Sequence, residues 1–467
     1  MDKQFYQSVK DELFNNILPY WEKFSRDTRP GFEGFFGHID NDNNCNAAVQ
    51  RSIVMTSRFL WTYSAVARMT KDVKYLQMAD FAYSVIINKF LDKKYGGVYW
   101  SVMPDGKPKI DKKQIYGEAF CCYGLCEYAA AVKELKEGDC DVLLSENQKS
   151  ETKLTSEATL PLSSSKESPI PSAGSNAARN ACSEQASEKE PLSEEAMNHA
   201  LDLYALLEKY AKDPDDGGYV EARAKNWKQT KDMILSPKDM NCPKSMNTNL
   251  HVMEAYTNLY RTLPVVFPDS KAIRMEVGES LTDLVRVTTQ FILQPNAHLG
   301  MFFDMHWKLL ADEISYGHDI EASWLLWEAA CELKDQELKA EIHDTVIRVA
   351  QVALDEGFDH ENGCMENFLK ENGTVRDRRR VWWNQAEAVN GFYNAWEMTG
   401  SQKYADAVLK TWSWIQNHQV DKTGGDWWSE LDANGNPILT ESKGGNWKTS
   451  YHNGRTCMEL LRRSKTM

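Results

Sequence analysis

The chain has 467 residues, and its 54 Lys+Arg against 68 Asp+Glu give a formal net charge of −14. This acidic balance without a basic stripe argues against nucleic acid as a partner, and no apolar run approaches the roughly 18 residues of a membrane-spanning helix. The start, MDKQFYQSVKDELFNN, lacks the apolar core of a secretory signal and the ten cysteines show no metal-type CxxC pairing, so we expect a cytoplasmic protein with reduced thiols.

A short pattern recurs along the chain: a glycine, several aromatic residues and often a turn rich in Asp, Asn and Gly. Its copies begin at Gly34, Gly96, Gly217, Gly300, Gly363 and Gly424. Such regular self-similarity marks a repeat architecture, here of about 60 to 70 residues per repeat. The pattern also accounts for much of the aromatic content, which includes 15 Trp.

The interval after the second copy is longer because of a segment of different composition, residues 138–190. Ser, Glu, Lys and Ala dominate it, and it contains no aromatic residue. Such a composition buries too little apolar area to offset the entropy of ordering. We predict a Ser-rich, disordered insertion that lies on the face opposite the functional site.

Each repeat has two segments with helical periodicity, one on either side of its glycine-aromatic loop. The segments before the loop, such as 74–91, 196–211 and 402–418, carry apolar residues at i, i+3, i+4 and i+7 with charges between them. The segments after the loop, such as 116–132, 317–333 and 382–398, are apolar nearly all round, which is typical of buried helices.

Six exposed and six buried helices in alternation predict an all-α fold, an (α/α)6 barrel of six helix pairs with short hairpin loops at one mouth. We expect one catalytic domain over residues 1–467, with hairpins at turns such as Asp105-Gly106. An open α-solenoid of helix pairs is the alternative.

In such a barrel, all six loops and all six inner-helix N-termini lie at one end. The inner helices begin with polar and aromatic residues that their later turns lack. Those singled out are Arg58, Tyr116, Asn247, His251, Glu254, His318, Glu321, Trp324, Trp383, Glu387, Trp447 and His452, with Arg455 beside them and given no role. Their gathering at one mouth predicts a polar pocket with aromatic walls, suited to stacking and hydrogen bonding a sugar.

Three of the ten histidines, His251, His318 and His452, begin inner helices. A helix N-terminus and burial both disfavour imidazolium, so we expect neutral bases near pH 7. Glu254 and Glu321 each follow a histidine by three residues, on one helix face, and we expect them to orient the imidazoles. The two His-x-x-Glu pairs also leave a metal site open as an alternative.

At these residues the sequence resembles the N-acylglucosamine 2-epimerase superfamily, and within it the branch that acts on cellobiose. The resemblance rests on SRFLWTYS, GGVYW, DKKQIYGEAF, MNTNLHVMEAYTNLYR, SYGHDIEASWLLWEA, WWNQAEAVNGFYNAW and WKTSYHNGRTCMEL. These segments span the chain apart from the Ser-rich insertion.

The resemblance implies an (α/α)6 barrel that uses neither metal nor cofactor. It implies 2-epimerisation of the reducing-end glucose of cellobiose and related β-1,4-linked disaccharides to mannose, through an enediol. His318 and His452 match the residues of proton transfer at carbon 2, and His251 matches the residue of ring opening. The positions that match substrate-binding or supporting residues are Arg58, Tyr116, Glu254, Glu321, Trp324, Trp383, Glu387 and Trp447, to which the polar helix start adds Asn247.

Three alternative functions fit the same residues. One is the same chemistry on another sugar, as in N-acylglucosamine 2-epimerase or an aldose–ketose isomerase of mannose. An inverting glycoside hydrolase would instead use a pair of carboxyl groups drawn from Glu118, Glu254, Glu321 and Glu387. A sugar-binding scaffold without catalysis is the third. We expect a disaccharide as the partner, no nucleic acid or membrane, and a monomer or weak homodimer.

Overall fold

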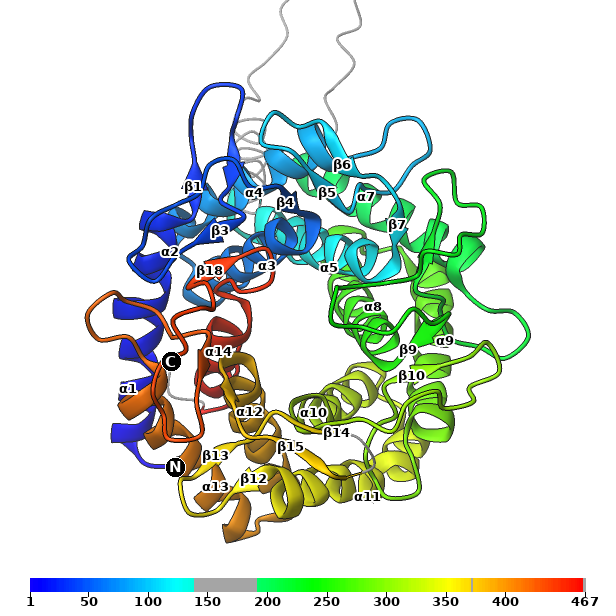
Figure 1. Ribbon diagram of the computed structural model, residues 1–467. Helices are drawn as coiled ribbons and strands as arrows, with labels where there is room; N and C mark the ends of the chain where they lie inside the picture. The colour runs from blue at the N-terminus through cyan, green and yellow to red at the C-terminus, as the bar shows by residue number, and fades with distance from the viewer. Residues whose placement is uncertain (138–190, 371–372, 465–467) are drawn as a thin grey trace, which may run out of the picture.

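The computed structural model describes residues 1–137, 191–370 and 373–464 of the chain. Within these residues, six helices form an inner ring (Figure 1). They are α3 (Ile53–Thr70), α5 (Ile115–Val132), α8 (Met246–Val266), α10 (Tyr316–Leu333), α12 (Trp382–Thr399) and α14 (Tyr451–Arg463). Each contacts the next, and the last, α14, contacts the first, α3, so the inner ring is closed.

An outer ring of helices surrounds the inner one, each packed against the inner helices beside it. It consists of α1 (Lys3–Asp11) with α2 (Leu18–Phe24), α4 (Leu76–Val85), α7 (Leu192–Leu206), α9 (Lys271–Val287), α11 (Gln336–Val352) and α13 (Gln402–Trp414). The predicted (α/α)6 barrel is confirmed, and the closed ring excludes an open solenoid.

Burial follows the sequence pattern. Every residue of α5 is buried, as expected of a segment that is apolar nearly all round, whereas α11 buries only one face. Glycine permits close packing inside the inner ring: a Cβ at Gly391 of α12 would lie 2.5 Å from the carbonyl oxygen of Ile320 in α10.

Most outer helices end in a π-helical turn that leads into the loop at the mouth. These turns are η3 (Ile86–Phe90), η5 (Leu207–Ala211), η6 (Thr288–Ile292), η7 (Ala353–Gly357) and η8 (Ile415–Gln419), and a further one, η1 (Glu12–Ile17), joins α1 to α2. The remaining short helical segments are η2 (Val73–Tyr75) and η4 (Lys133–Glu137). Wider turns of this kind are often found at functional ends of helices.

Short strands link the loops around the mouth. Five of them immediately precede inner helices: β4 (Arg51–Ser52), β7 (Lys113–Gln114), β9 (Lys244–Ser245), β11 (Ile314–Ser315) and β16 (Arg380–Val381). A sixth, β18 (Gly444–Gly445), lies five residues before α14. They pair with strands of the following loop: β5 (Ser101–Val102), β8 (Ala222–Arg223), β10 (Phe302–Phe303), β14 (Phe368–Lys370), β17 (Glu430–Leu431) and, for β18, β3 (His38–Ile39). The β18–β3 pair joins the last loop to the first and so completes the ring of loops around the mouth.

The remaining strands form local pairs: β1 (Arg26–Asp27) with β2 (Gly34–Phe35), β6 (Pro108–Ile110) with β5, β12 (Phe358–Asp359) with β13 (Cys364–Met365), and β15 (Val375–Asp377) with β14. The hairpin predicted at Asp105-Gly106 is the β5–β6 pair, in which Ser101 faces Ile110. Gly106 supplies the positive φ of 84° that its turn needs.

Buried ion pairs fasten these strands to the loops. Lys113 in β7 lies 2.8 Å from Asp92, and both side chains are buried. Similar pairs recur in other repeats: Arg51–Asp27, Lys244–Asp213 and Lys443–Asp421 are buried. In the pair Arg380–Asp359 the arginine is buried and the aspartate is partly exposed. In the fourth repeat the place of the cation is taken by Ile314.

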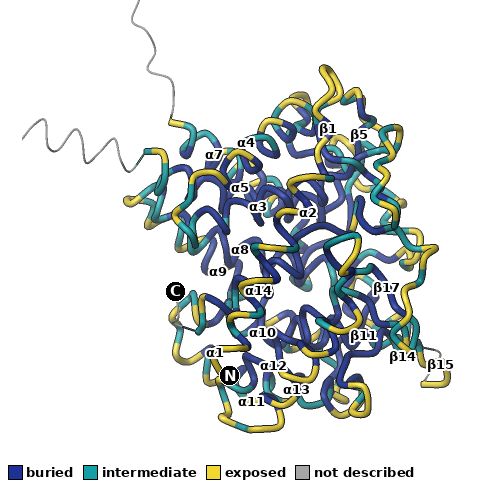
Figure 2. The backbone as a smooth tube through the Cα atoms, turned by 90° about the vertical axis from the view of Figure 1, so that its left-hand side faces the viewer, coloured by how far each residue is buried: buried dark blue, intermediate teal, exposed yellow. Residues whose placement is uncertain are grey.

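The predicted Ser-rich insertion, 138–190, lies outside the described residues. Its described neighbours, η4 and the start of α7, lie at the end of the barrel away from the strand loops (Figure 2). Glu137 and Ser193, on either side, are joined by a 2.6 Å hydrogen bond from Ser193 Oγ to Glu137 Oε2. The eight cysteines of the described part are free thiols, and no helix there is long and apolar enough to span a membrane.

Candidate active site

A cavity of about 680 Å³ opens at the mouth where the strand loops meet. Nine of the twelve residues predicted for the site line it: Arg58, Tyr116, Asn247, His251, His318, Glu321, Trp383, Trp447 and His452. The other three, Glu254, Trp324 and Glu387, are buried behind this wall. A groove of about 750 Å³ between α7 and α9 is lined only by residues of the outer ring and contains none of them.

Polar side chains of the cavity wall, together with Glu387 behind it, form a layer at one height in the barrel. Arg58, His251, Glu321 and Glu387 are each the sixth residue after the N-cap of their own inner helix. Because these helices run side by side with their N-termini at one end, residues in the same register lie at the same depth.

His251 is bound by a carboxylate from its own helix. Its Nδ1 lies 2.7 Å from Glu254 Oε2, as the i, i+3 spacing predicts. Burial lowers the pKa of His251, although the Glu254 carboxylate opposes this shift. The ring also meets Tyr116 edge to face, with ring centres 5.0 Å apart. His251 is therefore neutral at pH 7 and held in one orientation.

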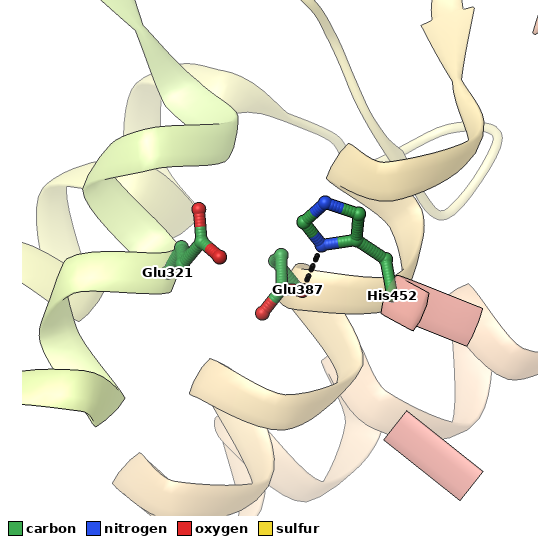
Figure 3. A group of neighbouring side chains, drawn as sticks. All are labelled: Glu321, Glu387 and His452. Carbon is green, nitrogen blue, oxygen red and sulfur yellow. Dashed lines mark hydrogen bonds and ion pairs between the residues drawn. The ribbon is translucent and has the colours of Figure 1, made fainter. Parts of the chain in front are cut away.

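His452 is bound by a carboxylate from a neighbouring helix. Its Nδ1 lies 2.7 Å from Glu387 Oε1 of α12 (Figure 3). The second oxygen of Glu387 accepts a 2.9 Å hydrogen bond from Trp324 Nε1. Burial lowers the pKa of His452 to about 3. Glu387 and Trp324 thus orient His452 from behind the cavity wall.

His318 differs from the other two, because its Nδ1 lies 2.7 Å from the hydroxyl of Ser315. The expectation that Glu321 orients His318 is wrong: Glu321 Oε1 accepts a hydrogen bond from Arg455 instead, 2.8 Å away. Burial lowers the pKa of His318 to about 3, and the neighbouring histidines add to the shift. Its ring packs against Trp383, with ring centres 4.6 Å apart.

Arg455 binds the carboxylates of three inner helices and received no role from the sequence. Its guanidinium donates to Glu254, to Glu321 and, over 2.7 Å, to Glu387. Although burial opposes ionisation, the Arg455 charge lowers the pKa of Glu254 to about 2 and lowers that of Glu387. Burial and the charge of Glu387 raise the pKa of Glu321 well above its usual value.

Arg58 supplies a positive charge to the cavity wall. Its guanidinium donates to the carbonyl oxygen of Trp447 over 2.7 Å and to the hydroxyl of Tyr116 over 3.0 Å. It also stacks on the ring of Phe120, 4.5 Å from its centre. These contacts fix the cation at the cavity, where it can stabilise a developing oxyanion.

Several polar atoms of the cavity wall have no hydrogen-bond partner in the described part of the chain. They are Asn247 Oδ1, Glu321 Oε2 and Trp382 Nε1. Buried polar groups are normally paired, so these atoms are suited to the hydroxyl groups of a ligand. Trp382, the first residue of α12, was not among the residues predicted for the site, although it is next to Trp383 in the sequence.

The described residues include one group with metal-ligand spacing, formed by Glu321, Glu387 and His452, whose ligand atoms lie within 4.8 Å of one another (Figure 3). Both carboxylates of this group accept hydrogen bonds from Arg455. A metal ion there would have to compete with a buried guanidinium that already balances the negative charge.

The same distances bear on the hydrolase alternative. An inverting hydrolase needs two carboxyl groups about 6.5–9.5 Å apart, and Glu321 and Glu387 are closer than that. Glu118 is unsuited, because both of its oxygens accept from the backbone N–H of Val98. Burial raises the pKa of Glu118 to about 8, and it holds a loop rather than facing the cavity.

The fold and site together are those of a carbohydrate isomerase built on an (α/α)6 barrel. The family model of N-acylglucosamine 2-epimerase matches residues 34–182 and 181–455. The chain is 34% identical to a cellobiose 2-epimerase of Bacteroides fragilis, over 99% of this chain and 100% of the relative. It superimposes on a cellobiose 2-epimerase of Spirochaeta thermophila with a TM-score of 0.79 and 30% identity, over 99% and 97% of the two chains.

The chain belongs to the N-acylglucosamine 2-epimerase family. Other members match over shorter stretches. A D-mannose isomerase of Marinomonas mediterranea is 30% identical over only 24% of this chain and 28% of its own length. An N-acylglucosamine 2-epimerase of Bos taurus is 26% identical over 31% of this chain and 35% of its own length.

Proposed function

We propose that the cavity epimerises the reducing-end glucose of cellobiose and related β-1,4-linked disaccharides to mannose at carbon 2. The observation that carries this proposal is that His318 and His452 line one cavity and that both imidazoles contact the ring of Trp383. Both imidazoles are neutral at pH 7 because burial lowers the pKa of each. Similarity to cellobiose 2-epimerases over the whole length favours this substrate class over mannose or N-acetylglucosamine.

The chemistry uses proton transfer between the sugar and the side chains beside it. The proton on carbon 2 of an open aldose is acidic because the adjacent carbonyl takes up the charge as an enediolate. One of His318 and His452 removes that proton, and the other returns one to the opposite face. Arg58, fixed beside Tyr116, stabilises the enediolate oxygen. His251, oriented by Glu254, opens the sugar ring and moves protons between the oxygens.

Positions further out hold the sugar rings. Trp383 and Trp447 offer aromatic faces on which pyranose C–H groups stack, and the free oxygen of Asn247 accepts from a hydroxyl group. Glu254, Trp324 and Glu387 contribute from behind the wall, through the histidines they orient. We further propose that the enzyme works in the cytoplasm as a monomer or weak homodimer.

Cellobiose in heavy water, followed by proton NMR, tests the proposal. Deuterium at carbon 2 together with growth of the manno disaccharide supports it, and a spectrum without either refutes it. Mannose and N-acetylglucosamine are examined in parallel. Faster conversion of mannose would identify an aldose–ketose isomerase, and faster conversion of N-acetylglucosamine would identify an N-acylglucosamine 2-epimerase. Free glucose released from cellobiose would favour a hydrolase.

A further inference from the structure

Arg455 is a buried arginine that contacts the site only from behind. It lies on α14, its side chain is 1% exposed, and it does not line the cavity. Besides its three carboxylate partners, it donates to the hydroxyl of Tyr451 over 2.6 Å and lies 4.8 Å from the ring centre of Trp324. A cation placed so deeply requires an explanation, because the loss of its hydration destabilises the fold unless its ionic partners offset that cost.

The guanidinium joins two separate histidine–carboxylate pairs. It donates to Glu254, whose other oxygen bonds His251 Nδ1, and to Glu387, which bonds His452 Nδ1. We propose that Arg455 is a positioning residue that sets the proton positions of both histidines at once. The expected effect on turnover rests on the proposed function. The expected effect on the proton positions of the histidines rests on the geometry alone.

The physical reason concerns which atom carries the proton. An ionised carboxylate can only accept a hydrogen bond, so it holds the proton on Nδ1 and leaves the other ring nitrogen free to act as a base. Without Arg455, Glu254 and Glu387 would be buried anions with no cation bound to them. A buried carboxylate in that position takes up a proton, and the resulting carboxylic acid donates to Nδ1. The proton of the imidazole then resides on Nε2, where the base is needed.

Other charged groups around Arg455 do not replace it. Glu321 from α10 adds no positive charge in either protonation state, and neither do the hydroxyl groups of Tyr123 from α5 and of Tyr451. Arg58 from α3 is the second cation nearby, but its hydrogen bonds go to Trp447 and Tyr116 rather than to the carboxylates. The cation that the three carboxylates share is therefore Arg455.

Steady-state kinetics of Arg455→Met and Arg455→Lys, across a range of pH, form the first test. We expect Arg455→Met to lower kcat on cellobiose about a hundredfold or more, the size of a lost general base, with KM changed less than about threefold. Its activity should recover as the pH rises, because the carboxylates ionise again. Arg455→Lys keeps the charge and should retain an intermediate kcat with a smaller shift of the acid limb.

Arg51→Met is the matched control, since Arg51 is also a buried arginine paired with a carboxylate, Asp27, and neither side chain lines the cavity. We expect it to lower the free energy of unfolding and leave the pH profile of kcat unchanged. A loss of kcat in Arg455→Met with an unmoved pH profile would overturn the proposal, as would a rise in KM alone. If Arg455→Met does not fold, Arg455→Lys decides by the same criteria.

A second test needs no turnover. Nitrogen NMR of protein with ¹⁵N-labelled histidine reports which ring nitrogen carries the proton. We expect Nδ1–H for His251 and His452 in the unchanged protein, and Nε2–H for both in Arg455→Met. Unchanged tautomers in the variant would refute the inference even in an active enzyme. The expected change in a protein that epimerises no sugar would support it while refuting the proposed function.

Discussion

His318 Nδ1 lies 2.7 Å from the hydroxyl oxygen of Ser315, whereas its two counterparts bond carboxylates. A hydroxyl group both donates and accepts, so Ser315 can satisfy Nδ1 in either tautomer of the imidazole. The carboxylates that bond His251 and His452 can only accept while they are ionised. His318 is thus the histidine whose proton can reside on either nitrogen without losing its hydrogen bond.

Ser315→Ala should therefore slow turnover without abolishing it. The loss of one hydrogen bond, about 1 kcal/mol, corresponds to a fall in kcat of about fivefold to tenfold, with KM little changed. Ser323→Ala is the matched control, since its hydroxyl donates to the backbone of the same helix, at Ile320. Equal effects of the two substitutions on kcat would contradict the role given to Ser315.

His318→Ala and His452→Ala should each remove most of the activity. The expected loss is about a hundredfold to ten-thousandfold in kcat, because each variant lacks one of the two groups that exchange protons with carbon 2. His306→Ala serves as the control, because its side chain is 80% exposed and pairs with Asp216 outside the cavity. Deuterium incorporation from heavy water gives the measurement. If either active-site variant incorporated deuterium at the unchanged rate, the substituted histidine would not be the residue that transfers the proton.

Acid should destabilise the folded protein in a defined window. His318 and His452 bind a proton near pH 6.5 in an unfolded chain but only near pH 3 when folded. Between these values the unfolded state binds more protons, so the free energy of unfolding falls as the pH decreases from about 6.5 towards 3. Thermal unfolding at a series of pH values measures this. The slope should be smaller in His318→Gln, and an identical slope would show that His318 does not contribute.

The fold was accessible from sequence because its signals are local. Helical periodicity, the recurring glycine-aromatic loop and the contrast between apolar and amphipathic segments each depend on a few neighbouring residues. The pair His251–Glu254 was predictable for the same reason, as its members are one turn apart on one helix.

The rest of the site depends on how the helices are rotated against one another. His452 and Glu387 are 65 residues apart and meet only because α14 packs beside α12. Glu321 follows His318 by the same three residues that separate Glu254 from His251, but its carboxylate accepts a hydrogen bond from Arg455 instead of bonding His318. Arg455 itself received no role because its partners come from three other helices. Spacing along one helix cannot predict contacts of this kind.

Removing one partner of a buried ion pair at the mouth should lower the free energy of unfolding more than replacing both partners with uncharged residues. Lys113→Ile leaves Asp92 buried without its cation, and we expect the free energy of unfolding to fall by about 3–5 kcal/mol. Adding Asp92→Asn should restore part of this loss, since Asn keeps an acceptor for the backbone N–H of Lys94 and Tyr95 without the charge. Urea unfolding measures both. A double variant no more stable than the single one would contradict the electrostatic explanation.

Removal of residues 140–188 should leave turnover intact. Glu137 and Ser193 are hydrogen-bonded to each other, so a short Gly-Ser linker can join the two sides of the deletion without displacing η4 or α7. Both ends lie away from the strand loops that form the cavity mouth (Figure 2). We expect kcat and KM on cellobiose within about twofold of the full-length values, a margin below 0.5 kcal/mol. A folded deletion variant without activity, with its helix content verified by circular dichroism, would show that the segment belongs to the site.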